Sequence, residues 1–207
     1  MLLRQSCILI VGLLLLPVVG AAQEGVPAIP VSQGYAPPTA GDRLTWVVEG
    51  TASLPVIAVD TVDSAWSTDV NWPQEWGRGF KGFGRRFGDE EAYATVADAI
   101  EASVGAIWSE DPRYKPSGQR STWRRVHHAV MATVLAPRRD GHLAPAWGRF
   151  TAIAAATEIE DEWLPPSART PGETAWRVAD DLIGRTLSNV WDEFWPDVRK
   201  WLPAFSK

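Results

Sequence analysis

Residues 110–114, Glu-Asp-Pro-Arg-Tyr, place two carboxylates, a guanidinium and a phenol side by side. Two carboxyl groups can act as general acid and general base when a pocket separates their pKa values. Glu110 and Asp111, with Arg113 beside them, are therefore candidate catalytic residues. Charges of this kind also cluster where a helix ends and ion pairs form locally. The sequence favours this second interpretation. The expected partner is Arg124 or Arg125.

His127 and His128 are adjacent on a predicted helix. Histidine can serve as a general base or as a metal ligand near neutral pH. Neighbouring residues of a helix point about 100° apart, so these two cannot easily share one metal ion. The motif H-E-x-x-H is absent. The sequence favours structural histidines and predicts no metal site. The alternative is a hydrolase that uses His127 with Glu110 or Asp111.

Residues 77–82 match G-x-G-x-x-G, the pattern of dinucleotide-binding loops. Such a loop follows a buried strand and opens a helix. Residues 71–76, Asn-Trp-Pro-Gln-Glu-Trp, do not read as a buried strand. Glycines up to Gly88 are instead expected to let the backbone turn tightly against aromatic rings. The acidic residues at 158–162 lack the spacing of a calcium loop. No cofactor is predicted.

Twelve tryptophans are spread along the chain. Tryptophan buries a large apolar area in a core, and it also collects at the headgroup level of membranes. Residues 194–202 are amphipathic enough for a membrane surface. The sequence favours the core. The alternative partner is a membrane surface or an envelope protein, contacted through Trp195 and Trp201.

The elements that must position these residues are mostly helices. Apolar residues recur at helical spacing, and Asp89, Ser121 and Thr170 stand where helix caps are expected. Residues 42–66 are ambiguous, since Thr39 with Asp42 suits a capping box, whereas the β-branched residues further on also suit a strand. We expect helices there too. The predicted ranges are 39–49, 56–66, 90–108, 122–136, 145–159 and a helix from 171 that breaks or kinks at Pro196.

The chain has 207 residues and a formal net charge of −5. An acidic chain is not a typical nucleic-acid binder, so no nucleic acid is expected as a partner. Arg4, an apolar run over residues 7–19 and the small residues before Gln23 have the pattern of a secretory signal peptide. We therefore expect an exported protein of the periplasm or cell envelope. The predicted divisions are a signal peptide (1–22), a flexible Pro/Gly-rich leader (23–42), a helical domain (43–202) and a tail (203–207).

Five segments occur here in an order that resembles an uncharacterised family of exported bacterial proteins, seen mostly in acidobacterial genomes. These segments are residues 73–77, 82–88, 105–114, 140–146 and 193–197. The resemblance covers about residues 43–202 and implies a signal peptide followed by Ala/Gly-rich helices. It implies no activity, because none is known to us for the family.

The sequence thus predicts a mainly α protein, with a single bundle-like domain of about four to six helices. The expected function is that of a non-catalytic binding or structural domain of the cell envelope. Association with a membrane is one form that this function could take. An enzyme with an unfamiliar site is the alternative.

Overall fold

The first two helices form in the segment where the sequence allowed either helix or strand. The computed structural model describes residues 35–201, and helices α2 (Ala40–Ala52) and α3 (Leu54–Asp69) open it. Thr39 and Asp42 make the predicted capping box, and Pro55 stands in the first turn of α3. The β-branched residues of α3 therefore do not form a strand. Helix α2 also begins inside the predicted 23–42 leader. The predicted signal peptide and tail lie outside the described residues.

Helix α4 (Phe80–Ile107) is longer than predicted. The sequence placed its start at Asp89, but the glycine-containing segment before Asp89 already forms its first turns, after the short 3₁₀ helix η1 (Gln74–Trp76). The predicted turns occur at Gly77 and Gly79, whose φ angles are 71° and 89°, but not at the glycines within α4, which instead permit a close approach. A Cβ atom on Gly82 would lie 2.2 Å from the carbonyl oxygen of Gly77. The first turn of α4 can pack against that loop only because Gly82 has no side chain.

A small hairpin, which the sequence analysis missed, separates the next two helices. Helix α5 (Thr122–Val134) ends two residues before its predicted end, and α6 (Trp147–Glu160) begins two residues after its predicted start. Strands β1 (Leu135–Pro137) and β2 (Leu143–Pro145) pair antiparallel between them. Ser121 precedes α5 as predicted, but its side chain makes no capping hydrogen bond.

Helix α7 (Pro171–Val198) begins as predicted and continues further than expected. The Thr170 side chain accepts a hydrogen bond from the backbone N–H of Glu173, and Pro171 stands in the first turn. Pro196 does not end the helix but lies inside its last turn. Short 3₁₀ helices precede and follow, η2 (Pro166–Ala168) and η3 (Arg199–Trp201).

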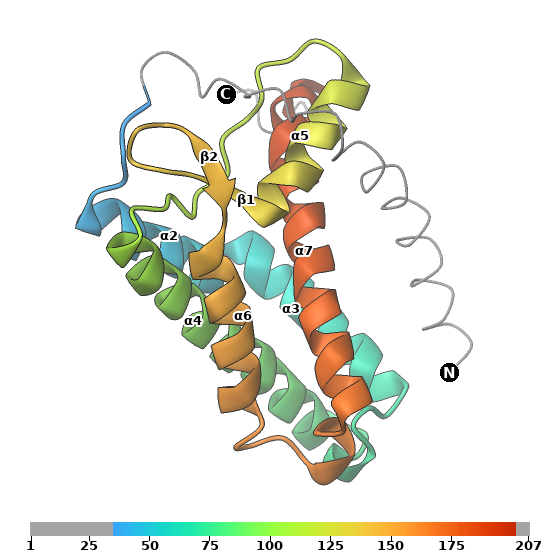
Figure 1. Cartoon of the computed structure of the whole chain (residues 1–207). Coiled ribbons are helices and arrows are strands. Elements are labelled where there is room, and N and C mark those ends of the chain that lie inside the picture. Colours follow the sequence, from blue (N-terminus) through green and yellow to red (C-terminus); the bar gives the residue numbers. More distant parts are fainter. Residues whose placement is uncertain (1–34, 202–207) are drawn as a thin grey trace.

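The helices form one bundle, and the mainly α prediction is confirmed (Figure 1). Helix α4 packs antiparallel to α6 on one side and against α2 and α3 on the other, while α5 packs along α7. Helices α4 and α6 approach closely through glycine and alanine. A Cβ atom on Gly148 would lie 3.2 Å from the Cα atom of Gly105. Further buried small residues on these two helices are Ala102, Ala152 and Ala156.

The tryptophans do not form the core, so that prediction is wrong. All twelve lie in residues 35–201, and each is half-buried or exposed. The buried apolar residues are mainly alanines, accompanied by Ile153 and Leu164. Helices joined through glycine and alanine leave little interior volume between them, and an indole needs far more room than a methyl group. Periodicity correctly located apolar helix faces, but several of these faces point to solvent.

Candidate functional site

Glu110 lies in the connector, which we define as residues 108–121 between α4 and α5. Its side chain is buried and accepts a hydrogen bond from the backbone N–H of Gly148, over 2.7 Å. An Arg138 nitrogen lies 3.3 Å from the other carboxylate oxygen. The Glu110 carbonyl accepts a hydrogen bond from Arg43, over 2.5 Å. Glu110 therefore ties the connector to α2, to the hairpin and to the start of α6.

Asp111 is equally buried, and it pairs with its near neighbour Arg113 and with the distant Tyr35. Arg113 donates to both of its carboxylate oxygens over 2.9 Å, and the Tyr35 hydroxyl donates to one of them over 3.2 Å. Burial, followed by the Asp111 charge, raises the pKa of Tyr35 to about 12. The hydrogen bonds to Asp111 are also the largest cause of a raised pKa for Arg113. This arrangement holds the chain before α2 against the connector.

The histidines do not join these carboxylates. His128 Nε2 lies 2.9 Å from the carbonyl oxygen of Lys115, and its ring meets Tyr114 edge-on at 5.8 Å between centroids. His127 is half-buried and forms no hydrogen bond or ion pair with a carboxylate among residues 35–201. The structure therefore brings Asp111 and Arg113 together, with Glu110 beside them, and leaves His127 out.

The most extensive hydrogen-bond cluster around the connector is centred on Glu193 of α7, a residue that the sequence did not single out. This buried carboxylate accepts hydrogen bonds from the Tyr114 hydroxyl, over 2.6 Å, and from the Ser117 hydroxyl and N–H, over 2.6 and 2.8 Å. Arg125 donates to the same carboxylate over 2.9 Å and to Asp197 over 2.6 Å. Arg125 is thus paired with α7. The predicted pairing of Arg125 with Glu110 or Asp111 is wrong.

The pKa of Glu193 is lowered by this pairing. Burial alone would raise it, but the hydrogen bonds from Ser117, Tyr114 and Arg125 outweigh burial and hold the pKa below its usual value. A carboxylate held in this way stays ionised and has no free proton to exchange near neutral pH. One signal in the sequence could have located it. Glu193 continues the spacing of Thr186 and Asn189, which face α5.

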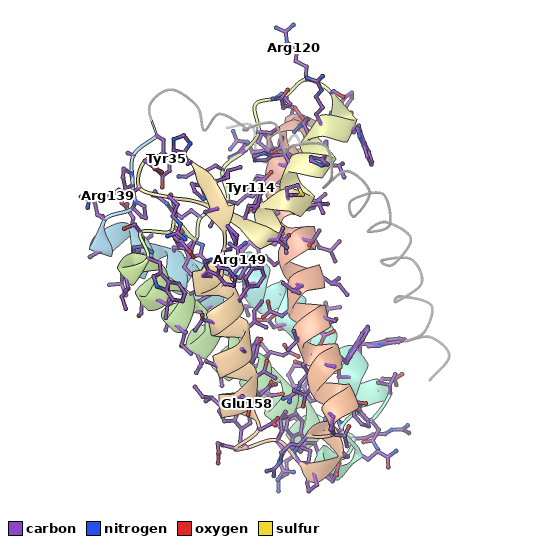
Figure 2. The ribbon with its side chains drawn as sticks, viewed as in Figure 1. Tyr35, Tyr114, Arg120, Arg139, Arg149 and Glu158 are labelled. Atoms are coloured by element: carbon purple, nitrogen blue, oxygen red, sulfur yellow. The ribbon has the colours of Figure 1, made fainter. Side chains whose placement is uncertain are left out.

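A second polar cluster fills the bundle interior. Arg149 of α6 donates to Glu101 of α4 over 3.0 Å, and Arg185 of α7 donates to the same Glu101 over 2.8 Å. Figure 2 shows Arg149 between the helices. Asp98 lies 3.6 Å from Arg185, and burial raises the pKa of Asp98 to about 7. Two pockets near Glu75, among residues 35–201, are lined by none of these groups. The cluster therefore holds α4, α6 and α7 together.

The surface at the α5 and α7 end is the most distinctive exposed region. Because α5 and α7 are antiparallel, the start of α5 lies beside the end of α7, and Arg120 projects beyond both (Figures 1 and 2). We call this region the tryptophan–arginine end. Its residues are Arg120, Trp123, Arg124, Leu187, Trp191, Trp195, Val198, Arg199, Lys200 and Trp201.

Exposure at the tryptophan–arginine end corrects the prediction that its apolar stripe is buried. Trp191 is 56% exposed and Trp201 is 84% exposed. Val198 is exposed too, whereas Phe194 is half-buried with the Arg125 guanidinium 4.1 Å from its ring centroid. Trp191 and Trp195 stack at 5.0 Å between centroids. Leu202 lies outside the described residues. The stripe on α7 is therefore an apolar surface and not a core face.

Two further observations bear on candidate functions. Among residues 35–201, no helix has the length and apolarity needed to cross a membrane. In the same residues, no group of three or more His, Cys, Asp and Glu side chains has a geometry that could hold a metal ion.

Comparisons place no relative beside this chain. No protein-family profile, no curated protein and no solved structure matches it. The resemblance to exported helical proteins stays an expectation from the sequence, and the function must be argued from the geometry alone.

Proposed function

We propose that this protein is an exported, non-catalytic helical domain that attaches to anionic lipid surfaces through the tryptophan–arginine end. The observation that carries the proposal is the exposed stripe of Leu187, Trp191, Val198 and Trp201 beside basic side chains. Indole rings with one wet edge are suited to the headgroup level of a bilayer, and an amphipathic helix can rest there without crossing it.

Charge supports an anionic surface as the partner. The two segments that form the tryptophan–arginine end, residues 120–125 and 187–201, carry five basic groups (Arg120, Arg124, Arg125, Arg199 and Lys200) against three acidic ones (Asp192, Glu193 and Asp197), although the whole chain has a net charge of −5. Arg120, Arg124 and Arg199 are exposed and form no ion pair with another described residue. Each basic side chain near an anionic leaflet contributes about 1 kcal/mol to attachment. This end is therefore the one expected to face the lipid.

Vesicle flotation tests this function. The purified protein is mixed with vesicles of phosphatidylcholine alone or with phosphatidylglycerol added, at low and at high salt. We expect flotation with the anionic vesicles, less of it at high salt, and little with phosphatidylcholine alone, because screening weakens exposed charges. Equal binding to both vesicle types, or no binding to either, contradicts the proposal.

Matched variants locate the surface. We expect Trp191→Ser with Trp201→Ser, and separately Arg124→Glu with Arg199→Glu, to abolish flotation. Trp147→Ser is the control for an exposed tryptophan, since Trp147 is 52% exposed on α6. Arg78→Glu is the control for an exposed arginine elsewhere. If the protein is a dimer that Trp191→Ser converts to monomers, the stripe is a subunit interface and the proposal fails.

The hydrolase hypothesis gains no support from the geometry. It requires His127 within hydrogen-bond reach of a carboxylate in a pocket. Glu110 and Asp111 are instead committed to Gly148 and Arg113, and no such contact joins either of them to His127.

A further inference from the structure

A second candidate site lies at the other end of the bundle, where α4 begins and α6 ends (Figure 1). Here η1, the second and third turns of α4 and the loop after α6 surround an open pocket of about 520 Å³. That volume is in the usual range for sites that bind small molecules. We call it the indole pocket. The residues used below are Glu75, Trp76, Arg85, Asp89, Trp163 and Pro165.

The wall that carries Trp76 is fixed from below by a buried arginine. Arg86 is only 2% exposed and donates hydrogen bonds to the carbonyl oxygens of Trp72, Pro73 and Gly77, over 2.5 to 2.9 Å. Its guanidinium also lies 5.9 Å from the Trp76 ring centroid. The loop that carries Trp76 is therefore held against α4 before any ligand arrives.

The opposite wall is fixed just as firmly. The indole N–H of Trp163 donates to Asp89 Oδ1 over 2.6 Å, and the neighbouring Leu164 is buried. The Ser167 hydroxyl donates to Glu75 over 2.7 Å, which links the two walls across the pocket. Preorganised walls lower the ordering cost of binding. The pocket therefore does not have to form around its ligand.

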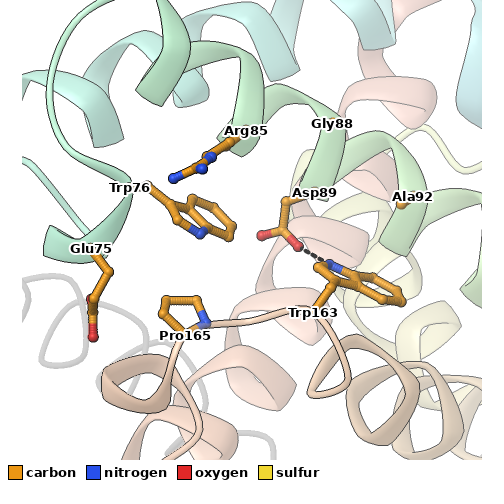
Figure 3. Close-up of a pocket in the computed structure, with 8 residues that line it drawn as sticks. All are labelled: Glu75, Trp76, Arg85, Gly88, Asp89, Ala92, Trp163 and Pro165. Atoms are coloured by element: carbon orange, nitrogen blue, oxygen red, sulfur yellow. Dashed lines mark hydrogen bonds between the residues drawn. The ribbon is translucent and has the colours of Figure 1, made fainter.

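Asp89 is only half satisfied. Figure 3 shows its carboxylate between the indoles of Trp76 and Trp163, with Pro165 below Trp76. One oxygen accepts the Trp163 hydrogen bond, and the other accepts none from the residues that the structure describes. A carboxylate with one free oxygen beside indole rings complements a cation, because the negative charge and the negative face of an indole attract the same partner. Glu75 adds a second carboxylate at the pocket edge, and Arg85 supplies the one lining guanidinium.

We propose that the indole pocket binds a small organic ammonium ion, with its charge against Asp89 and its alkyl groups between Trp76 and Trp163. Two indoles and a proline suit alkyl groups, whereas a bare metal ion would need more oxygen ligands than this pocket offers. A sugar could also stack on the indoles and donate hydroxyl hydrogen bonds to Asp89, so the test includes a sugar beside the cations. The ammonium can belong to a free metabolite or to a choline headgroup of a lipid.

Titration calorimetry with choline chloride and with putrescine tests the proposal, with potassium chloride as the ionic-strength reference. We expect saturable binding of at least one of the two cations. Asp89→Asn should weaken it at least tenfold, since asparagine keeps an acceptor for Trp163 and removes only the charge. Trp163→Leu should also abolish it. Glu158→Gln, which removes an exposed charge from the same end of the molecule, should leave the affinity unchanged.

Three results would overturn the proposal. These are the absence of binding by both cations, undiminished binding in the Asp89→Asn variant, and binding of maltose in place of the cations. Flotation of the variant that carries Trp191→Ser and Trp201→Ser with phosphatidylcholine vesicles distinguishes the two sources, because binding through the tryptophan–arginine end is removed in that variant. If the vesicles capture the protein and Asp89→Asn abolishes this capture, the ligand is a lipid headgroup. If free choline binds in the calorimeter but the vesicles do not capture the protein, the ligand is soluble.

Discussion

The connector and the indole pocket contain the same kinds of side chain but differ in how completely these are paired. In the connector cluster, Glu193 accepts four side-chain or backbone hydrogen bonds, from Tyr114, Ser117 twice and Arg125. In the pocket, Asp89 accepts one. A fully paired carboxylate stabilises the fold, whereas a half-paired one between aromatic rings keeps capacity for a ligand. The charged motif of residues 110–114 thus has a structural role. The candidate ligand site is the indole pocket, whose residues the sequence did not single out as functional.

The largest effect should come from breaking the connector cluster. Glu193→Ala leaves Arg125, Tyr114 and Ser117 without their shared acceptor. Removing one partner of a buried ion pair costs about 3–5 kcal/mol, so we expect a large drop in the melting temperature. Thermal unfolding followed by circular dichroism measures it. Glu162→Ala, at an exposed acid after α6, is the control and should shift stability by less than about 0.5 kcal/mol. Similar melting temperatures of both variants would show that the hydrogen bonds of Glu193 do not stabilise the fold.

The next effect concerns the close contact between α4 and α6, on which both regions depend. In Gly148→Ala the new Cβ atom would meet Glu110 Oε2 at 3.0 Å and the Gly105 nitrogen at 3.1 Å. Overpacking of this kind costs about 1–3 kcal/mol. Gly184→Ala is the matched control, because a Cβ there meets nothing within 4 Å. Alanine is the better helix former by roughly 0.5–1 kcal/mol, so this control should melt slightly higher. Urea unfolding of both variants checks the difference.

The dependence of stability on pH sharpens the same contrast. A carboxyl group whose pKa is raised by folding stabilises the protein most at low pH and loses that contribution as pH rises through the folded value. Burial is the largest cause of such raised pKa values, to about 6 for Asp60 and Asp89, about 7 for Asp98 and Glu160, and about 9 for Glu90. We therefore expect a higher melting temperature at pH 5 than at pH 8.

Glu193 works in the opposite direction, because its pKa is lowered and its contribution is lost only as pH falls below the usual carboxylate range. Calorimetric melting across pH 3 to 8 should thus show a maximum at about pH 4, near the ordinary carboxyl pKa, because the raised groups lose stability above that value and Glu193 loses it below. In Glu193→Gln the loss of stability below that maximum should become shallower, while the loss towards pH 8 should persist. A melting temperature that rises steadily up to pH 8 would contradict the assignment of the raised groups.

The smallest effect should come from the pocket itself. Asp89→Asn removes a partly buried charge and keeps the acceptor for Trp163, so we expect a change within about 1 kcal/mol. The size of this change depends on pH, since the pKa of Asp89 is raised to about 6. The variant should be more stable than the parent at pH 8, and this difference should vanish only as the pH falls to about 4, where the carboxyl group is protonated in the folded and the unfolded chain alike. A loss as large as that of Glu193→Ala would mean that Asp89 is a structural residue.

The sequence located the helix start at Thr170, where the cap and the periodicity agreed, and at Thr39, where the capping box was the signal, because these signals are local. It missed the first turns of α4, because glycine disfavours helix in isolation, and here the contact of Gly82 with the loop before it outweighs that preference. It missed the hairpin at Leu135–Pro145 because three-residue strands carry almost no periodic signal. These outcomes share a cause. Local preference is readable from the chain, and tertiary contact is not.

The same reasoning explains the candidate residues. Glu110, Asp111 and Arg113 were prominent because they are neighbours in the chain, and the pairing of Asp111 with Arg113 is equally local. Glu193 and Arg125 come together across α5 and α7, at a separation that no motif encodes. Burial of the tryptophans was wrongly predicted because an apolar stripe reports which face is apolar and not whether a neighbour covers it. The residues that decide the site are the ones whose partners are distant in the chain.

The glycine and alanine contact between α4 and α6 also limits how this sequence can drift. A larger residue at Gly105 would meet Arg43 and Glu110, and one at Gly148 would meet Glu110 and Gly105, so only the smallest side chains fit at these two positions. Exposed apolar positions such as Val59 and Leu54 are under no such restriction from the bundle. In any lineage that keeps this fold, the small residues along α4 and α6 should therefore change slowly, while the outer surface of α3 diverges freely unless a partner restrains it.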